Sequence, residues 1–263
     1  MRTAILISSC DYFEDCWEPM IFSIKKFWPN CSFPIYIISN FKEIKDEKVA
    51  FLKVGEDRQF ASNLKRALHM IDYESIIYFQ EDYFIDSFVD NASIMAHIDH
   101  CHNEGLDFIK IGFDSMFRDA LRIKDSIYCQ NPINKKYSIN TAISIWRRHT
   151  LEMLCIDGFS GWDFERKIIP FIRQNNITIR SEVLYSKVFP EQGIKCVDGT
   201  AVRRGKWTKS GREFLESNGF NRIIEGRKTE SNLLLFLMSL YRPHSLLRIP
   251  VAITIKIFQK LNL

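Results

Sequence analysis

The sequence contains no long apolar run. Its 263 residues include no stretch of about 18 consecutive apolar side chains, the length that a helix needs to cross a membrane. The apolar stretch near the N-terminus, residues 3–9, is too short for a signal peptide and has the pattern of a strand. From these two absences we expect a cytoplasmic protein.

Paired cysteines and dense positive charge are also lacking. The seven cysteines are an odd number, they are scattered, and no two have Cys-x-x-Cys spacing. This pattern argues against a disulfide framework and indicates a reducing compartment. The net charge of +4 is modest, whereas a nucleic-acid binding protein needs a dense basic face. We therefore expect no nucleic-acid partner.

Short apolar runs alternate with segments of helical spacing, which predicts an α/β fold. The length suits one large α/β domain or two small ones. Strands are expected at residues 3–9, 33–39, 49–54, 75–80, 107–112 and 140–146. Helices are expected at residues 11–28, 60–71, 87–101 and 147–155.

One strand ends in acidic residues. The apolar run from Ser75 to Phe79 reads as a strand buried on both faces, and it leads directly into Gln80, Glu81 and Asp82. Buried carboxylates need a partner, and ligands of open α/β sheets bind at the carboxyl ends of strands. Two carboxylates there suit a hard cation that carries a diphosphate. The alternative is an acidic surface turn.

Polar residues elsewhere are placed to flank the same cleft. Ser9 and Asp11 follow the first strand, where such residues often meet a nucleotide base or ribose, although they are equally good turn and capping residues. Asn63 and Lys65 lie on the polar side of the helix that leads into the acidic strand. For these two, a solvated helix face is the alternative.

The segment after residue 159 combines a helix cap with an aromatic–acidic pair. Ser160 and Asp163 match the capping pattern [ST]-x-x-[DE], which gives Asp163 a structural role. Trp162 and Glu165 then share one helix face. An indole ring can stack on a sugar while the carboxylate takes a hydroxyl proton. An ordinary surface helix explains the same spacing.

Basic residues gather near the end of the chain. They surround Gly205 and Trp207, where close backbone approach suits a diphosphate, and they are Arg203, Arg204, Lys206, Lys209 and Arg212. A basic surface for nucleic acid or anionic lipid is the alternative. In contrast, we interpret His97 and Cys101 as part of a polar, exposed helix end, because no second ligand cluster follows them to complete a zinc site.

The last part of the chain is strongly apolar and basic. Residues 232–240 and 246–258 resemble two short apolar helices with interspersed Arg and Lys. This pattern fits a segment lying in a membrane interface, or a helical pair packed on the main domain or on a second subunit. We divide the chain into a main domain, 1–228, and a helical C-terminal segment, 229–263, which is a candidate membrane-interface anchor.

These motifs, taken in order over roughly residues 3–220, resemble the GT-A glycosyltransferases that build bacterial lipopolysaccharide, O-antigen and capsule. The matching motifs are Ser8 to Asp11, the helix Asn63-Leu64-Lys65-Arg66-Ala67-Leu68, the acidic motif Gln80-Glu81-Asp82-Tyr83-Phe84, Trp162-Asp163-Phe164-Glu165, and Ala201-Val202-Arg203-Arg204-Gly205-Lys206-Trp207. The resemblance implies a Rossmann-like, mixed and mainly parallel sheet flanked by helices, with a C-terminal helical extension.

The resemblance also implies an inverting sugar transfer with a nucleotide-diphosphate sugar, a UDP-sugar above all. Asp82 stands where the family ligates Mn²⁺ or Mg²⁺, and Glu81 where it contacts the ribose or the metal shell. Gln80 departs from the family by occupying the first acidic position. Glu165 is implied as the base that deprotonates the acceptor, with Asp163 as second choice.

The remaining implied roles concern donor and acceptor binding. The nucleoside pocket is implied to contain Ser9, Asp11, Asn63 and Lys65. The diphosphate is implied to meet Arg203, Arg204 and Lys206. Substrate contacts are implied for Trp162, Trp207 and Tyr83. The acceptor is expected to be a saccharide, lipid-linked and held at the cytoplasmic face of the inner membrane, where the basic apolar tail keeps the enzyme.

Two other functions compete with this interpretation. A sugar-1-phosphate nucleotidyltransferase also uses an α/β sheet, acidic metal ligands and a basic phosphate site. It is expected to carry a loop rich in Gly, Arg and Lys after its first strand, and the sequence has residues 8–12 without any of these. A non-enzymatic module that binds a membrane or nucleic acid through residues 200–263 leaves Glu81, Asp82 and Glu165 without a purpose.

Overall fold

The computed structural model describes residues 2–112, 121–185 and 190–230. It divides into two compact units, Met1–Thr200 and Ala201–Leu263, and each is described by itself. The predicted boundary after residue 228 falls inside the second unit. The predicted C-terminal helical segment lies outside the described residues, apart from Thr229 and Glu230.

The first unit is built on a mixed sheet with, among the residues described, nine strands in the order β3-β2-β1-β4-β8-β5-β9-β7-β6. The strands are β1 (Thr3–Ser8), β2 (Ile35–Ser39), β3 (Val49–Lys53), β4 (Ser75–Gln80), β5 (Phe108–Lys110), β6 (Leu121–Arg122), β7 (Tyr128–Gln130), β8 (Ser144–Arg147) and β9 (Ser181–Leu184). Only β7 and β8 run opposite to the other described strands. The predicted Rossmann-like, mainly parallel sheet is confirmed.

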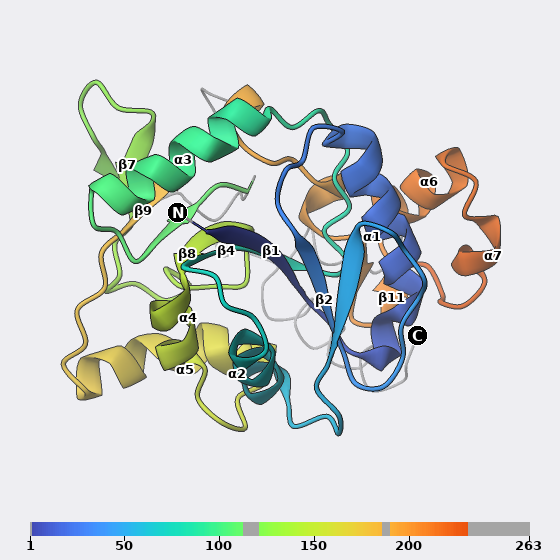
Figure 1. The fold of residues 1–263 in the computed structure, drawn as a ribbon, viewed down its shortest axis with the longest axis horizontal. Helices are drawn as coiled ribbons and strands as arrows, with labels where there is room; N and C mark the ends of the chain where they lie inside the picture. Colours follow the sequence, from blue (N-terminus) through green and yellow to red (C-terminus); the bar gives the residue numbers. More distant parts are fainter. Residues whose placement is uncertain (1, 113–120, 186–189, 231–263) are drawn as a thin grey trace, which may run out of the picture. The chain divides into compact units, whose positions relative to one another are not determined.

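Helices cover both faces of this sheet (Figure 1). The helices are α1 (Glu14–Phe27), α2 (Phe60–His69), α3 (Asn91–Asn103), α4 (Arg148–Leu154) and α5 (Gly161–Gln174). On one face, α2, α4 and α5 pack with Leu6 of β1 and Tyr78 of β4 in one apolar core. Figure 1 shows α1 and α3 on the opposite side. Since both faces are covered, the central strands β1 and β4 are buried along almost their whole length, as the run at residues 75–79 predicts.

Two predictions at element boundaries are wrong. Helix α3 begins at Asn91 rather than near residue 87, because the Asp90 side chain accepts hydrogen bonds from the backbone amides of Ala92 and Ser93 and caps the helix there. Its residues His97 and Cys101 are buried, not part of an exposed helix end. Strand β8 begins at Ser144, so residues 140–143 form a loop rather than the first half of a strand.

The described part of the second unit contains a small hairpin and two helices. Strands β10 (Val202–Arg203) and β11 (Lys206–Trp207) pair in antiparallel fashion. Arg204 and Gly205 connect them with φ of 53° and 74°, the left-handed geometry of a tight two-residue turn. Helices α6 (Lys209–Ser217) and α7 (Asn221–Ile224) follow. In the described ranges, no helix of either unit combines the length and the apolarity that crossing a membrane requires.

Candidate functional site

The site predicted from the sequence lies at the carboxyl ends of β1 and β4. These strands are parallel neighbours in register, with Ser8 opposite Gln80. The chain order of the sheet reverses between them, because β2 and β3 lie on one side of β1 and β4 lies on the other. Ligands of open α/β sheets bind at such a switch point. The backbone amide of Glu81 donates to the Ser8 carbonyl at 3.3 Å, so the two polar loops leave the sheet together.

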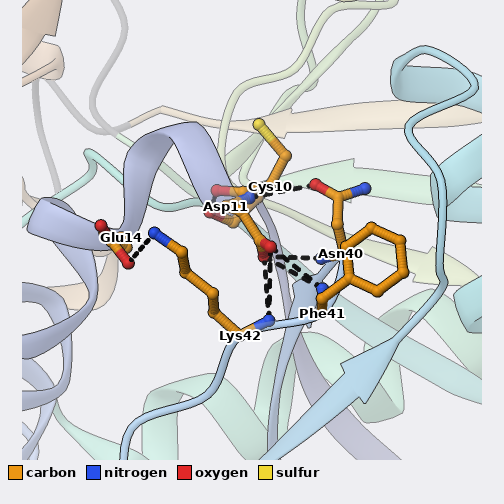
Figure 2. A network of polar contacts seen from close by, with 7 residues as sticks. Cys10, Asp11, Glu14, Asn40, Phe41 and Lys42 are labelled. Atoms are coloured by element: carbon orange, nitrogen blue, oxygen red, sulfur yellow. Dashed lines mark hydrogen bonds and ion pairs between the residues drawn. The ribbon is translucent and has the colours of Figure 1, made fainter.

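Asp11 joins the loop after β1 to the loop after β2 (Figure 2). Its carboxylate accepts hydrogen bonds from the backbone amides of Asn40 at 2.8 Å, Phe41 at 3.0 Å and Lys42 at 3.3 Å. In return, the Asp11 amide donates to Asn40 Oδ1 at 3.1 Å. Both carboxylate oxygens take part. This network holds the two loops in place, whatever binds beside them.

Ser9 and Asn63 are likewise engaged within the protein. Ser9 Oγ accepts a hydrogen bond from the Trp17 indole at 2.8 Å. Asn63 donates to the Asp57 carboxylate at 2.8 Å and accepts from the backbone amide of Arg58 at 3.0 Å, which organises the start of α2. Both side chains shape the edge of the sheet at the positions where the sequence suggests nucleoside contacts.

Lys65 lies on α2 and is half-buried. Burial is the main cause that raises the pKa of Cys155 far above its usual value, and the positive charge of Lys65 is the opposing influence. Lys65 therefore lies close to the C-terminal end of α4.

The two carboxylates after β4 are buried. Glu81 is 9% exposed and Asp82 is 7% exposed. Asp82 Oδ2 accepts a hydrogen bond from the Thr200 hydroxyl. Thr200 follows a segment that runs along the loop after β4, where the amide of Val197 donates to the Phe84 carbonyl at 3.0 Å. The sequence gives no sign of this contact, because Thr200 lies 118 residues from Asp82.

Electrostatic effects show that the acidic groups lie together. Burial raises the pKa of the Cys10 thiol, and the negative charges of Glu81 and Asp57 add to the effect. Cys10, Glu81 and the start of α2 therefore share one neighbourhood at the carboxyl edge of the sheet.

Glu165 reaches the same edge from α5. Its Oε1 accepts hydrogen bonds from both the amide of Thr141, at 3.0 Å, and the Thr141 hydroxyl, at 2.8 Å. Burial raises the pKa of Tyr83 well above its usual value; the charges of Asp82 and Glu165 add to this, and a hydrogen bond with the Thr141 side chain opposes it. The structure thus brings Tyr83, Asp82 and Glu165 together.

Asp163 has the capping role that the sequence predicts. Ser160 and Asp163 form a capping box, with Ser160 Oγ accepting from the Asp163 amide at 3.1 Å. The Lys167 ammonium, 2.8 Å away, and the Ser160 hydroxyl hold the pKa of the Asp163 carboxyl below its usual value. One helical turn therefore carries two carboxylates with different surroundings.

The two tryptophans differ in exposure. Trp162 is 69% exposed on the first turn of α5, on the helix side that also carries Glu165. Trp207 is 0% exposed, and the Arg227 guanidinium lies 5.7 Å from its ring centre. An exposed ring offers a face to a substrate, whereas the burial of Trp207 supports a structural role in the second unit.

The basic residues of the hairpin also differ from one another. Arg203 forms an ion pair with the buried carboxylate of Glu230 at 3.2 Å. Arg204 is exposed at the turn, and Lys206 is half-buried on β11. Of Arg203, Arg204 and Lys206, Arg204 is therefore the residue most accessible to an anion.

The two carboxylates after β4 can hold a metal ion only if a substrate supplies further ligands. The described ranges contain no group of three or more His, Cys, Asp or Glu side chains that could hold a metal by themselves. Mg²⁺ is usually held by one or two carboxylates together with substrate phosphates. Asp82 and Glu81 fit such a shared ion, with the substrate supplying the other ligands.

Comparisons with known proteins give structural neighbours only. No protein-family model matches the sequence, and no curated protein matches it. Among solved structures, S. aureus TarS is similar with a TM-score of 0.47 and 15% identity, over 74% of this chain and 36% of TarS. TarS 1-349 in complex with UDP-GlcNAc has a TM-score of 0.44 and 14% identity, over 70% and 56% of the two chains.

A nucleotidyltransferase is similar at a comparable level. A cytidylyltransferase from Leptospira borgpetersenii serovar Hardjo-bovis has a TM-score of 0.40 and 14% identity, over 69% of this chain and 74% of its own. This chain therefore spans little more than a third of full TarS and about three quarters of the cytidylyltransferase.

Proposed function

We propose that this protein is a glycosyltransferase that moves a sugar from a nucleotide-diphosphate sugar to a saccharide acceptor. One observation carries the proposal: two buried carboxylates, Glu81 and Asp82, follow β4 at the switch point of the sheet, next to Glu165. Carboxylates at the carboxyl ends of strands suit a hard cation that carries a diphosphate.

Glu165 acts as the base in an inverting displacement. Its carboxylate takes the proton of an acceptor hydroxyl, and the acceptor oxygen forms a bond to the anomeric carbon from the opposite face. The bond from that carbon to the diphosphate oxygen breaks, and the nucleoside diphosphate leaves with the electron pair. Trp162, exposed on the same turn of α5, stacks against a sugar ring. Tyr83 borders the acceptor position.

Charge on the leaving diphosphate needs stabilisation. Asp82 and Glu81 would hold Mn²⁺ or Mg²⁺, and the ion would neutralise part of this charge. Arg203, Arg204 and Lys206 contribute further positive charge to the diphosphate. The polar loops that contain Ser9 and Asp11, together with Asn63 and Lys65, border the nucleoside.

The finer assignment follows from the resemblance of the motifs to polysaccharide-building enzymes. The donor is a UDP-sugar, and the acceptor is a lipid-linked saccharide of a bacterial surface polymer. The apolar, basic segment 229–263 keeps the enzyme on the inner-membrane surface through anionic lipid.

The first test is a thermal-shift screen of the full chain with UDP, GDP, CMP and their common sugars, each with and without Mn²⁺. We expect one UDP-sugar to raise the unfolding temperature, and Mn²⁺ to enlarge the shift. A metal-independent shift retains the transferase but removes Asp82 as a metal ligand. No shift from folded protein contradicts the proposal and favours a binding module.

A product assay separates transfer from nucleotidyl chemistry. With the donor identified, a glycosyltransferase releases the nucleoside diphosphate and free sugar or a glycosylated acceptor. A nucleotidyltransferase instead consumes a nucleoside triphosphate and a sugar 1-phosphate and releases pyrophosphate. Pyrophosphate release dependent on a sugar 1-phosphate would replace the proposed activity with the competing one.

A further inference from the structure

The loop before β8 reaches the proposed site because β8 runs against its neighbours. Strand β8 pairs with β4 in antiparallel fashion, and Ser144 lies opposite Tyr78. The residues that precede β8 therefore lie beside the residues that follow β4. This places Thr141 at the same edge of the sheet as Asp82 and Tyr83.

Thr141 holds one oxygen of Glu165 with two donors. Both the Thr141 amide and its hydroxyl donate to Glu165 Oε1, at 3.0 and 2.8 Å. A carboxylate accepts, so the hydroxyl gives its single proton to Glu165. No described residue forms a hydrogen bond to Oε2. One oxygen of the base is therefore fixed, while the other is available to a substrate hydroxyl.

We infer that Thr141 is a positioning residue for the proposed base. This inference rests on the proposed glycosyl transfer. Thr141 sets the rotamer of Glu165 and turns Oε2 toward the acceptor.

The test compares T141V with T141S in the full chain. Valine keeps the shape of threonine but removes the hydroxyl, whereas serine keeps the hydroxyl. We expect T141V to lower kcat about ten- to a hundredfold, because a misplaced catalytic group can cost that much, with the donor KM changed less than about twofold. T141S restores most of kcat.

T141A is the second variant and covers the case in which T141V does not fold. It also removes the hydroxyl that donates to Glu165, and we expect a similar loss of kcat with the donor KM little changed. A T141V enzyme with wild-type kcat contradicts the inference. So does a T141S enzyme as impaired as T141V, or, if T141V unfolds, a T141A enzyme with wild-type kcat.

Failure of the inference is distinguishable from failure of the proposed function. If the wild type turns over a nucleotide sugar and E165Q does not, while T141V behaves as wild type, only the positioning role is lost. If no nucleotide sugar is turned over, or E165Q retains full activity, the assignment of the base itself is lost.

Discussion

Two carboxylates at the carboxyl edge of the sheet differ in how fully they are hydrogen-bonded. Asp11 uses both oxygens to accept from three consecutive backbone amides, at residues 40, 41 and 42 (Figure 2). Glu165 uses one oxygen, which accepts two bonds from Thr141. A carboxylate that accepts hydrogen bonds on both oxygens holds the backbone in place. A carboxylate that accepts them on one oxygen only is oriented by them and can still accept a proton on the other. The sequence marks both as site residues, and their hydrogen bonds separate the two roles.

The largest effect is expected from E165Q. The amide keeps the size of the side chain but cannot take a proton, so we expect kcat for transfer to fall about 10²- to 10⁴-fold. The donor-induced thermal shift should remain, because the donor does not depend on this proton transfer. Initial rates and the thermal shift of the same preparation provide the measurement.

Asp163 supplies a matched control on the same helix. D163N removes a carboxylate that is already committed to the Ser160 cap and to Lys167. We expect transfer to survive in D163N with a lower unfolding temperature. Equal loss of donor binding and transfer in E165Q, or loss of transfer in D163N alone, contradicts the choice of Glu165.

D11A tests Asp11, the carboxylate whose two oxygens both accept hydrogen bonds. It leaves the amides of residues 40–42 without their carboxylate, so we expect the free energy of unfolding to fall by about 2 kcal/mol, as for a lost hydrogen-bond set to a charged group. Urea unfolding measures this. E14Q is the control, because it removes only the neighbouring exposed ion pair with Lys42, and we expect a loss of less than about 1 kcal/mol. Similar small losses of unfolding free energy in D11A and E14Q contradict a stabilising role for the Asp11 hydrogen bonds.

Local signals in the sequence predict part of the fold and site. The apolar run before Gln80, the acidic motif and the Ser160–Asp163 cap all depend on residues within a few positions of one another, so periodicity and spacing predict them. The start of α3 is missed although its cap is local, because Asp86, Ser87 and Asp90 offer similar capping chemistry.

The remaining site residues depend on contacts far apart in the chain. Thr141 lies 24 residues from Glu165, and Thr200 lies 118 residues from Asp82. Thr141 reaches the site through the antiparallel direction of β8, and Thr200 reaches it through the segment that runs along the loop after β4. No local pattern specifies either arrangement. The polar pair Asn140 and Thr141, directly before an apolar run, is the signal in the sequence that could have pointed to Thr141.

His97 extends the comparison to a group whose two hydrogen-bonding atoms are both used. Its Nε2 donates to the Gln192 carbonyl at 2.7 Å, so Nδ1 accepts from the Tyr128 hydroxyl at 2.6 Å, and the ring is neutral. Burial lowers the pKa of His97 and the nearby His100 adds to this, while the hydrogen bond to Gln192 opposes it. By the argument made for Asp11, this saturated group is structural.

A pH series tests that conclusion and yields the smallest expected effect. The unfolded chain protonates His97 near its ordinary pKa of about 6.5, but the folded chain protonates it only at lower pH. Below about pH 6.5 the unfolded state therefore binds more protons, and the free energy of unfolding falls as the pH falls, until the folded pKa is passed. In urea unfolding, H97Q should show a smaller dependence of the free energy of unfolding on pH. At pH 8 His97 is neutral in both states, so the free energy of unfolding that H97Q loses there reports the packing cost alone. Parallel curves for H97Q and wild type contradict a neutral, buried His97, and hence the use of hydrogen-bond saturation to separate structural groups from chemical ones.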